Sequence, residues 1–141
     1  MGGFRIFNFT HQLLELSMRA RGARHEVLSA NIANADTPGF RPRDLDFESV
    51  IRTATELDDH PVSRERQMDE MLAAPVALNA AIYEPLANDQ RHGEERFDGN
   101  SVSLDRQIAL LNENALSYEA SVTLFSRAMA KLRYVISDGR G

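Results

Sequence analysis

The feature that most constrains the fold is an uninterrupted apolar stripe in the C-terminal part of this 141-residue sequence. Ten apolar residues follow one another there in alternating steps of four and three. Such steps place side chains along one side of an α-helix, and their strict alternation is the heptad spacing of coiled coils and helical bundles. The stripe consists of Leu104, Ile108, Leu111, Ala115, Tyr118, Val122, Phe125, Met129, Leu132 and Ile136.

A single helix from about residue 103 to residue 137 accounts for this stripe. Ser103 suits the N-cap position, Asp105 the first turn, and Gly139 the position after the helix end. At 1.5 Å per residue the helix is roughly 50 Å long, which is more than a compact domain of this size normally requires. A second apolar row on the same helix comprises Leu110, Leu124, Ala128 and Val135.

Two apolar rows give this helix more apolar surface than one partner helix covers. We therefore predict that it packs as a coiled coil or bundle that includes other chains. A compact monomeric bundle, completed by helices from the middle of the sequence, is the alternative that the pattern leaves open.

The N-terminal part of the sequence has a shorter stripe of the same kind. It predicts a helix from about Thr10 to Asn34, which Gly22 weakens by roughly 1 kcal/mol relative to alanine. Residues 1–9 lie before this stripe, and we predict that they are disordered. The stripe consists of Leu13, Leu16, Ala20, Ala23, Val27 and Ala30, followed at the same spacing by Asn34.

A turn motif ends the predicted N-terminal helix. Asn34 tolerates the left-handed conformation of a helix terminus, Asp36 can bond to its own backbone two residues on, and Pro38-Gly39 suits the centre of a type II turn. The turn sets Phe40 to pack beside the helix. For Asn31 and Asn34, capping or fixing the helix register is a likelier role than binding a ligand. The motif comprises Asn31, Asn34, Asp36, Thr37, Pro38, Gly39 and Phe40.

The middle of the sequence is acidic, and all five prolines fall between Pro38 and Pro85. Residues 44–99 carry a net charge of −9, against +3 for residues 1–43 and +1 for residues 100–141. Short helices are predicted at 46–52, capped by Asp46, and at 68–72. Residues 55–70 are polar enough to stay mobile, residues 75–86 suit an extended strip, and Asp98-Gly99-Asn100 suits a turn.

These patterns predict a mainly α fold in four parts. A disordered N-terminus (1–9) precedes the N-terminal helix and turn motif (10–43), an acidic and partly flexible middle segment (44–100) and the long C-terminal helix (101–141). The two terminal helices are expected to pack together as a coiled coil or bundle, and the irregular middle to include short extended strips.

Composition narrows the functional classes. There is no cysteine, no run of 18 apolar residues and no apolar core of a cleaved secretory signal, which makes the cytoplasm the default location. The four histidines show no metal-ligand spacing, and phosphate-binding and nucleophile motifs are absent from the sequence. We therefore predict no catalytic residues, no cofactor and no metal. The pI of about 5.3 argues against nucleic-acid binding.

Several segments closely resemble the flagellar basal-body rod proteins. Residues 24–47, which read RHEVLSANIANADTPGFRPRDLDF, resemble the N-terminal signature of that family. Residues 98–105 (DGNSVSLD), residues 114–118 (NALSY) and Leu132-Arg133 resemble its C-terminal turn and helix. The departures are mild: Phe40-Arg41 replaces a common Tyr-Lys, Ser101 and Ser103 replace Asn and Asp, and Gln107 replaces Glu.

The resemblance implies a non-enzymatic structural subunit of the flagellar rod. Such proteins pass unfolded through the flagellar type III export apparatus, and residues 1–9 would serve as an export signal that is not cleaved. In the periplasm their terminal helices pack into a helical tube that transmits motor torque. The implied partners are further copies of the chain, other rod proteins and the adaptor proteins between rod and membrane ring, with no nucleic acid and no membrane insertion.

A soluble coiled-coil adaptor or type III secretion chaperone is the rival functional class, because heptad spacing alone does not separate it from a rod subunit. The turn motif favours the rod, since a chaperone has no need of it. A chaperone should also form a defined dimer in solution, whereas a rod subunit should stay monomeric until it meets its neighbours.

Overall fold

A computed structural model describes residues 2–57, 60–73, 82–83 and 103–138 of the chain. Within these residues the fold is mainly α, as predicted. The helices are α1 (Gly2–Ala33), α2 (Phe47–Thr55), α3 (Pro61–Ala73) and α5 (Leu104–Asp138). Two short strands, β1 (Asp44–Leu45) and β2 (Ile82–Tyr83), complete the described elements.

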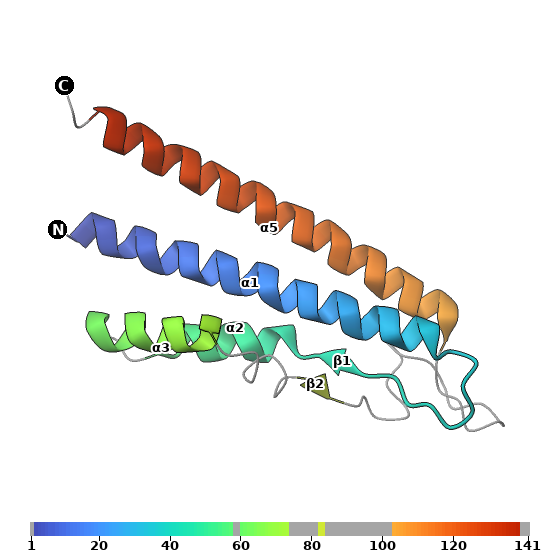
Figure 1. Cartoon of the computed structure of the whole chain (residues 1–141). Coiled ribbons are helices and arrows are strands. Elements are labelled where there is room, and N and C mark those ends of the chain that lie inside the picture. The colour runs from blue at the N-terminus through green and yellow to red at the C-terminus, as the bar shows by residue number, and fades with distance from the viewer. Residues whose placement is uncertain (1, 58–59, 74–81, 84–102, 139–141) are drawn as a thin grey trace.

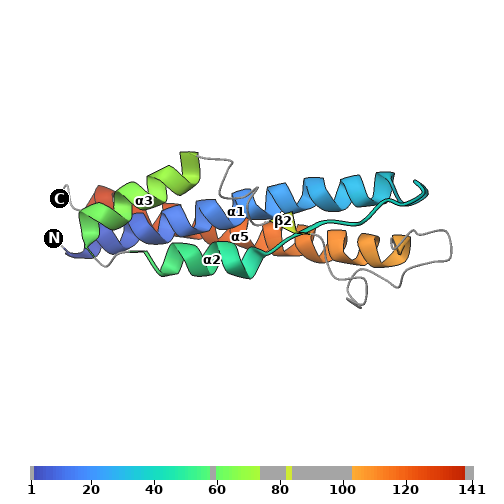
Figure 2. The same cartoon turned by 90° about the horizontal axis from the view of Figure 1, so that it is seen from below.

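The helices form three layers with α1 in the middle. Helix α5 packs along one side of α1, and α2 and α3 cover the other side (Figure 1). Helix α1 starts at the end of the molecule where α5 finishes, so the two long helices are antiparallel (Figures 1 and 2). The long C-terminal helix therefore packs on the N-terminal helix, as the two stripes predicted.

The main apolar core lies between α1 and the layer of α2 and α3. Its buried members are Leu16, Ala20, Leu45, Val50, Ala54 and Met68. The half-buried side chains packed around them are Phe9, Leu13, Ala23, Phe47, Leu57, Met71, Leu72 and Ile82. Most of the N-terminal stripe is thus covered by the middle segment of the same chain, since α2 and α3 together present a matching apolar side.

Helix α1 begins at Gly2, which corrects the expectation that residues 1–9 are disordered. The physical reason lies at Phe9. Its ring packs against the core, and the guanidinium carbon of Arg64 lies 5.0 Å from the ring centroid. Helix α3 thereby supports the first turns of α1, which the sequence pattern around residues 1–9 did not reveal.

The middle segment is more ordered than its polar composition indicated. Residues 55–70 were expected to be mobile, yet α3 covers residues 61–73 and contains the short helix predicted at 68–72. Met68 is fully buried, Arg19 donates to the Leu72 carbonyl at 2.9 Å, and Gln12 donates to Asp69 at 2.9 Å. One apolar side and a few hydrogen bonds are enough to hold α3 against α1, so a largely charged sequence is helical here.

Helix α2 and strand β2 agree with the sequence, whereas strand β1 was not predicted. Asp46 caps α2 by accepting a hydrogen bond from the Ser49 amide at 3.0 Å, and the helix continues three residues beyond the predicted end. β1 pairs with β2 in antiparallel register, which opposes Leu45 to Ile82. The rest of the strip predicted at 75–86 and the turn predicted at 98–100 lie outside the described residues.

The turn motif has the predicted geometry at Gly39 but not at Asn34. Gly39 has φ of 72°, and the Phe40 amide donates to the Thr37 carbonyl at 3.1 Å, as a type II turn requires. No described residue other than glycine has positive φ, so Asn34 is not left-handed. The chain leaves α1 instead through right-handed turns, in which Ala35 bonds to Ile32 and Thr37 to Asn34.

Substitutions at Gly22 and Gly39 are expected to change stability in opposite directions. A β-carbon would meet no atom within 4 Å at either Gly22 or Gly39, so backbone conformation alone decides the outcome. Gly39→Val should lower the free energy of unfolding by roughly 1–3 kcal/mol, because a β-branched residue is strained at positive φ. Gly22→Ala should raise it by roughly 0.5–1 kcal/mol, because Gly22 lies inside α1. Urea denaturation of both purified variants measures this, and a Gly39→Val variant as stable as the parent would contradict the turn assignment.

Candidate assembly surface

The side of α5 that faces α1 is mostly polar. Gln107 is fully buried, Asn114 is 1% exposed and Ser121 is 8% exposed. Asn114 donates to the Arg21 carbonyl of α1 at 2.8 Å, and the hydroxyl oxygens of Ser17 and Ser121 lie 3.5 Å apart. Leu110, 8% exposed, is the buried apolar residue of this side. Helix α5 is therefore held to α1 largely by specific polar contacts.

The apolar stripe of α5 lies on a different side and is largely exposed. The exposed fraction reaches 46% at Leu104, 42% at Tyr118 and 50% at Ile136. Ile108, Ala115 and Val122 are exposed as well, whereas Leu111, Phe125, Met129 and Leu132 are half-buried. The most regular apolar row in the sequence thus does not supply the main contact within the chain.

Helix geometry explains why the stripe and the buried side separate. A straight α-helix has 3.6 residues per turn, so a strict heptad row drifts by roughly 20° per heptad around its axis. Over this stripe the drift reaches roughly 90°. The row consequently points away from α1 near Leu104 and turns toward it near Phe125, which accounts for the half-buried side chains of the later positions.

The two long helices diverge toward the end that carries both termini (Figure 1). The rings of His11 and Phe125 still meet there edge to face, with centroids 5.9 Å apart. Farther along α5, Tyr134 is 66% exposed and Val135 is 51% exposed. On the flank away from the stripe, Leu116 and Leu124 are 70% and 54% exposed. Helix α5 therefore presents apolar side chains on two flanks.

The predicted N-terminal packing residues lie in three environments. Leu13, Leu16, Ala20 and Ala23 belong to the core formed with α2 and α3. Val27 is half-buried and Ala30 is exposed. Of this stripe, only the last positions offer surface to another molecule, and the exposed residues of α5 form the larger apolar surface.

Asn31 joins three segments of the chain. Its side chain accepts a hydrogen bond from the Arg43 amide at 2.9 Å and donates to the Arg43 carbonyl at 2.7 Å. It also donates to the Gln107 side chain of α5 at 2.9 Å. Capping belongs instead to Asn34, whose side chain donates to the Ala30 carbonyl at 2.8 Å. Asn31 thus fixes the returning chain against α1 and sets the position of α5.

The rest of the turn motif lies at the surface. Asp36, Thr37, Pro38 and Gly39 are exposed and Phe40 is half-buried. Sequence reasoning missed Gln107 and Arg43 as partners of Asn31. The signal available for Gln107 was its place, with Asn114 and Ser121, in a polar row seven residues apart beside the apolar stripe.

Charged side chains of α1 make internal contacts. Arg24 forms a two-pronged ion pair with the buried Asp44 carboxylate, with both distances 2.7 Å. Arg21 lies over the Phe47 ring with its guanidinium carbon 4.1 Å from the centroid. Burial lowers the pKa of Arg21, Arg24 lowers it further, and Glu113 partly opposes both. These arginines position β1 and α2, which fits their role in the fold better than nucleic-acid binding.

Among the described residues, no group of three or more His, Cys, Asp or Glu side chains is arranged to hold a metal ion. None of the described helices is long and apolar enough to cross a membrane.

Comparisons with known proteins identify the family. The family model described as flagella basal body rod protein matches residues 17–41, which span the second half of α1 and the turn motif. The flagellar basal body rod protein FlgB of Yersinia ruckeri is 31% identical over 132 residues, covering 87% of this chain and 90% of the relative. The chain belongs to the family of flagellar basal body rod proteins. This confirms the resemblance seen in the sequence.

Two further relatives carry the same name. FlgB of Escherichia coli K12 is 31% identical over 130 residues, covering 87% of this chain and 89% of the relative. FlgB of Proteus mirabilis strain HI4320 is 29% identical over 136 residues, covering 94% of each. The family is structural and non-enzymatic, and its members belong to the flagellar basal body, which fixes the functional class of this chain.

The Asn31 contacts give a prediction about stability. Asn31→Ala leaves the buried Gln107 oxygen and the Arg43 amide without this partner, and should lower the free energy of unfolding by roughly 1–3 kcal/mol. Asn34→Ala is the matched control. It removes a bond to a carbonyl that also accepts the Asn34 amide, and should cost less than about 1 kcal/mol. Urea denaturation measures both, and equal losses would contradict the special role of Asn31.

Proposed function

We propose that this rod protein is a self-assembling subunit whose α5 stripe is covered by helices of neighbouring subunits. The observation that carries the proposal is the exposure of the stripe, at 46% for Leu104 and 42% for Tyr118, while polar residues occupy the side against α1. Apolar side chains gain stability when water is excluded from them. A regular exposed row of them on one helix therefore favours contact with another chain.

The two apolar flanks of α5 support an open assembly rather than a closed dimer. When a subunit offers two different surfaces, each contact leaves one surface of either type free, so the assembly continues as a ring or a helix. In this proposal a helical tube of such subunits forms the proximal part of the rod and transmits torque. The turn motif sets the direction in which the chain leaves α1 toward β1 and α2.

The partners in the proposed assembly include other rod proteins and the adaptor proteins between rod and membrane ring. We also propose that the chain reaches the periplasm through the flagellar export apparatus. Membership in the rod family supports this part of the proposal, as do the exposed apolar side chains on both flanks of α5.

A soluble adaptor or secretion chaperone is the second candidate, favoured by the same exposed stripe. The two candidates differ in the oligomeric state expected for the purified chain. A chaperone would bury the stripe in a defined dimer, so light scattering of the purified chain would give twice the mass of 15.8 kDa. The rod proposal expects a monomer at the same concentration.

Electron microscopy of basal bodies tests the proposal directly. The strain carries an in-frame deletion of the gene and is compared with the same strain after complementation. Rods should be missing above an intact membrane ring in the deletion strain and present after complementation. Normal rods in motile deletion cells would refute the proposal and favour the adaptor.

An exposed residue of α5 and one of α2 provide a pair of variants. Val122 and Thr53 are both exposed and similar in shape, but only Val122 lies in the stripe. Val122→Asp should abolish rod assembly, because a charge buried between chains has no partner there. Thr53→Asp should leave rods in place. Complementation followed by a swimming assay and microscopy measures both, with export of each variant monitored in parallel, and equal effects would contradict the assignment of the stripe.

A further inference from the structure

The last third of α5 combines exposed apolar side chains with positive charge. From Ala120 to Ser137 the sequence contains three basic residues and no acidic residue. These basic residues, Arg127, Lys131 and Arg133, are all exposed. The exposed side chains of Leu124, Tyr134, Val135 and Ile136 belong to the same third of the helix. This is the part of α5 that diverges from α1 (Figure 1). At 3.6 residues per turn, Leu124, Arg127, Lys131, Tyr134 and Val135 share one face of the helix, whereas Arg133 and Ile136 lie on other sides. Within the described chain this shared face is exposed.

The opposite outer layer of the molecule carries the opposite charge. On α2, α3 and the residues that flank α2, six acidic side chains are exposed against two basic ones. The acidic residues are Asp46, Glu48, Glu56, Glu65, Asp69 and Glu70, and the basic ones are Arg52 and Arg66. Arg66 lies 3.6 Å from Glu70, with both side chains more than two-thirds exposed, so this pair neutralises little of the surface.

The two charged faces lie at the same end of the molecule. Helix α3 covers the end of α1 where both termini are found, and α5 finishes at that end on the other side of α1 (Figures 1 and 2). A second copy placed beside the first in the same orientation would therefore bring its α3 against the last third of α5. No reversal of one copy is required.

We infer that the basic, apolar last third of α5 docks on the acidic outer face of α2 and α3 of a second copy of this chain. The inference rests on the proposed function and names one partner surface for it. The contact joins two different faces of identical chains, so it repeats from copy to copy without closing a pair. Charge sets the orientation and the register of the contact, and the apolar residues of α5 provide the area.

A reciprocal exchange of charges tests this contact in cells of the complemented deletion strain. One variant carries Arg127→Glu and Lys131→Glu, and a second carries Glu65→Arg and Glu70→Arg. Either variant alone should reduce the swimming rate and rod number roughly tenfold, because attraction becomes repulsion at several positions. The variant with all four substitutions should regain swimming and rods.

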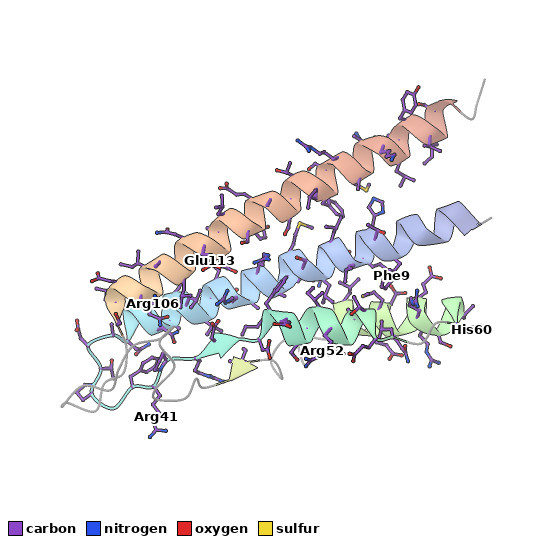
Figure 3. All side chains as sticks on the ribbon, turned by 180° about the vertical axis from the view of Figure 1, so that it is seen from behind. Phe9, Arg41, Arg52, His60, Arg106 and Glu113 are labelled. Atoms are coloured by element: carbon purple, nitrogen blue, oxygen red, sulfur yellow. The ribbon has the colours of Figure 1, made fainter. Side chains whose placement is uncertain are left out.

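A control reverses one charge at the other end of α5. Arg106 lies on the same helix but near the turn motif, far from α3 (Figure 3). Arg106→Glu combined with the two α3 substitutions should remain as defective as the α3 variant. Normal rods in either single-face variant, or no recovery in the fourfold variant, would overturn the inference. Rods that survive these changes but disappear with Val122→Asp would leave the proposed function intact.

The single lysine of the chain allows the contact to be located chemically. A carbodiimide joins a lysine amine to a carboxylate that it touches, without a spacer. Basal bodies from complemented cells are treated and digested. Peptides that link Lys131 to Glu65, Asp69 or Glu70 are expected. Since α1 lies between α5 and α3 within one chain (Figure 1), such a link joins two copies. Links only to carboxylates elsewhere would overturn the inference.

An anionic lipid surface is the competing occupant of a basic, apolar helix face. Binding of the purified chain to vesicles that contain phosphatidylglycerol tests this alternative. If binding is lost with Arg127→Glu and Lys131→Glu, and rods form normally with the α3 substitutions, the occupant is a membrane and the inference is overturned. The inference expects that the variant with all four substitutions regains rods and that Arg127→Glu and Lys131→Glu do not change vesicle binding.

Discussion

The most extensive contacts between the described helices all involve α1, which must satisfy two different neighbours at once. Its apolar side, centred on Leu16 and Ala20, packs on α2 and α3. Its other side meets α5 through Asn31, Ser17 and the Arg21 carbonyl. Burial of apolar area stabilises the first contact without strong demands on register, whereas the second depends on individual hydrogen bonds that form only in one alignment.

Because the second contact is largely polar, much of the apolar surface of α5 is exposed within the described chain. A buried polar group contributes little net stability once its lost hydration is included, but it penalises every misaligned arrangement. Gln107 and Asn114 therefore specify where α5 lies on α1 more than they stabilise it. If the stripe of α5 faced α1 instead, the two-helix contact would be stronger and no regular apolar row would remain for other subunits. The position of α5 on α1 is thus specified within the chain, and in the proposed assembly neighbouring subunits cover the apolar row.

Much of the architecture could be predicted from the sequence, because it depends on long periodic segments and local caps. The extent of α5, the Asp46 cap and the positive φ of Gly39 all followed from single residues or rows. Which side of α5 faces α1 did not follow, since apolarity favoured the heptad row while the buried side contains Gln107 and Asn114. The order of α3 and of the first turns of α1 also escaped prediction. Those segments are held by contacts distant in sequence, such as Arg64 with Phe9, which no local pattern encodes.

The separation of charge between layers bears on how the proposed assembly would begin. The net charge of −5 makes copies of the chain repel one another in most orientations. In the proposed contact the basic residues of the last third of α5 approach the acidic residues of α2 and α3, and exposed charges attract over about 10 Å at ordinary ionic strength. Apolar contact would follow at shorter range and supply most of the stability. In this proposal the charges therefore select the orientation of two copies before the apolar stripe is covered, which favours growth in one direction over random association.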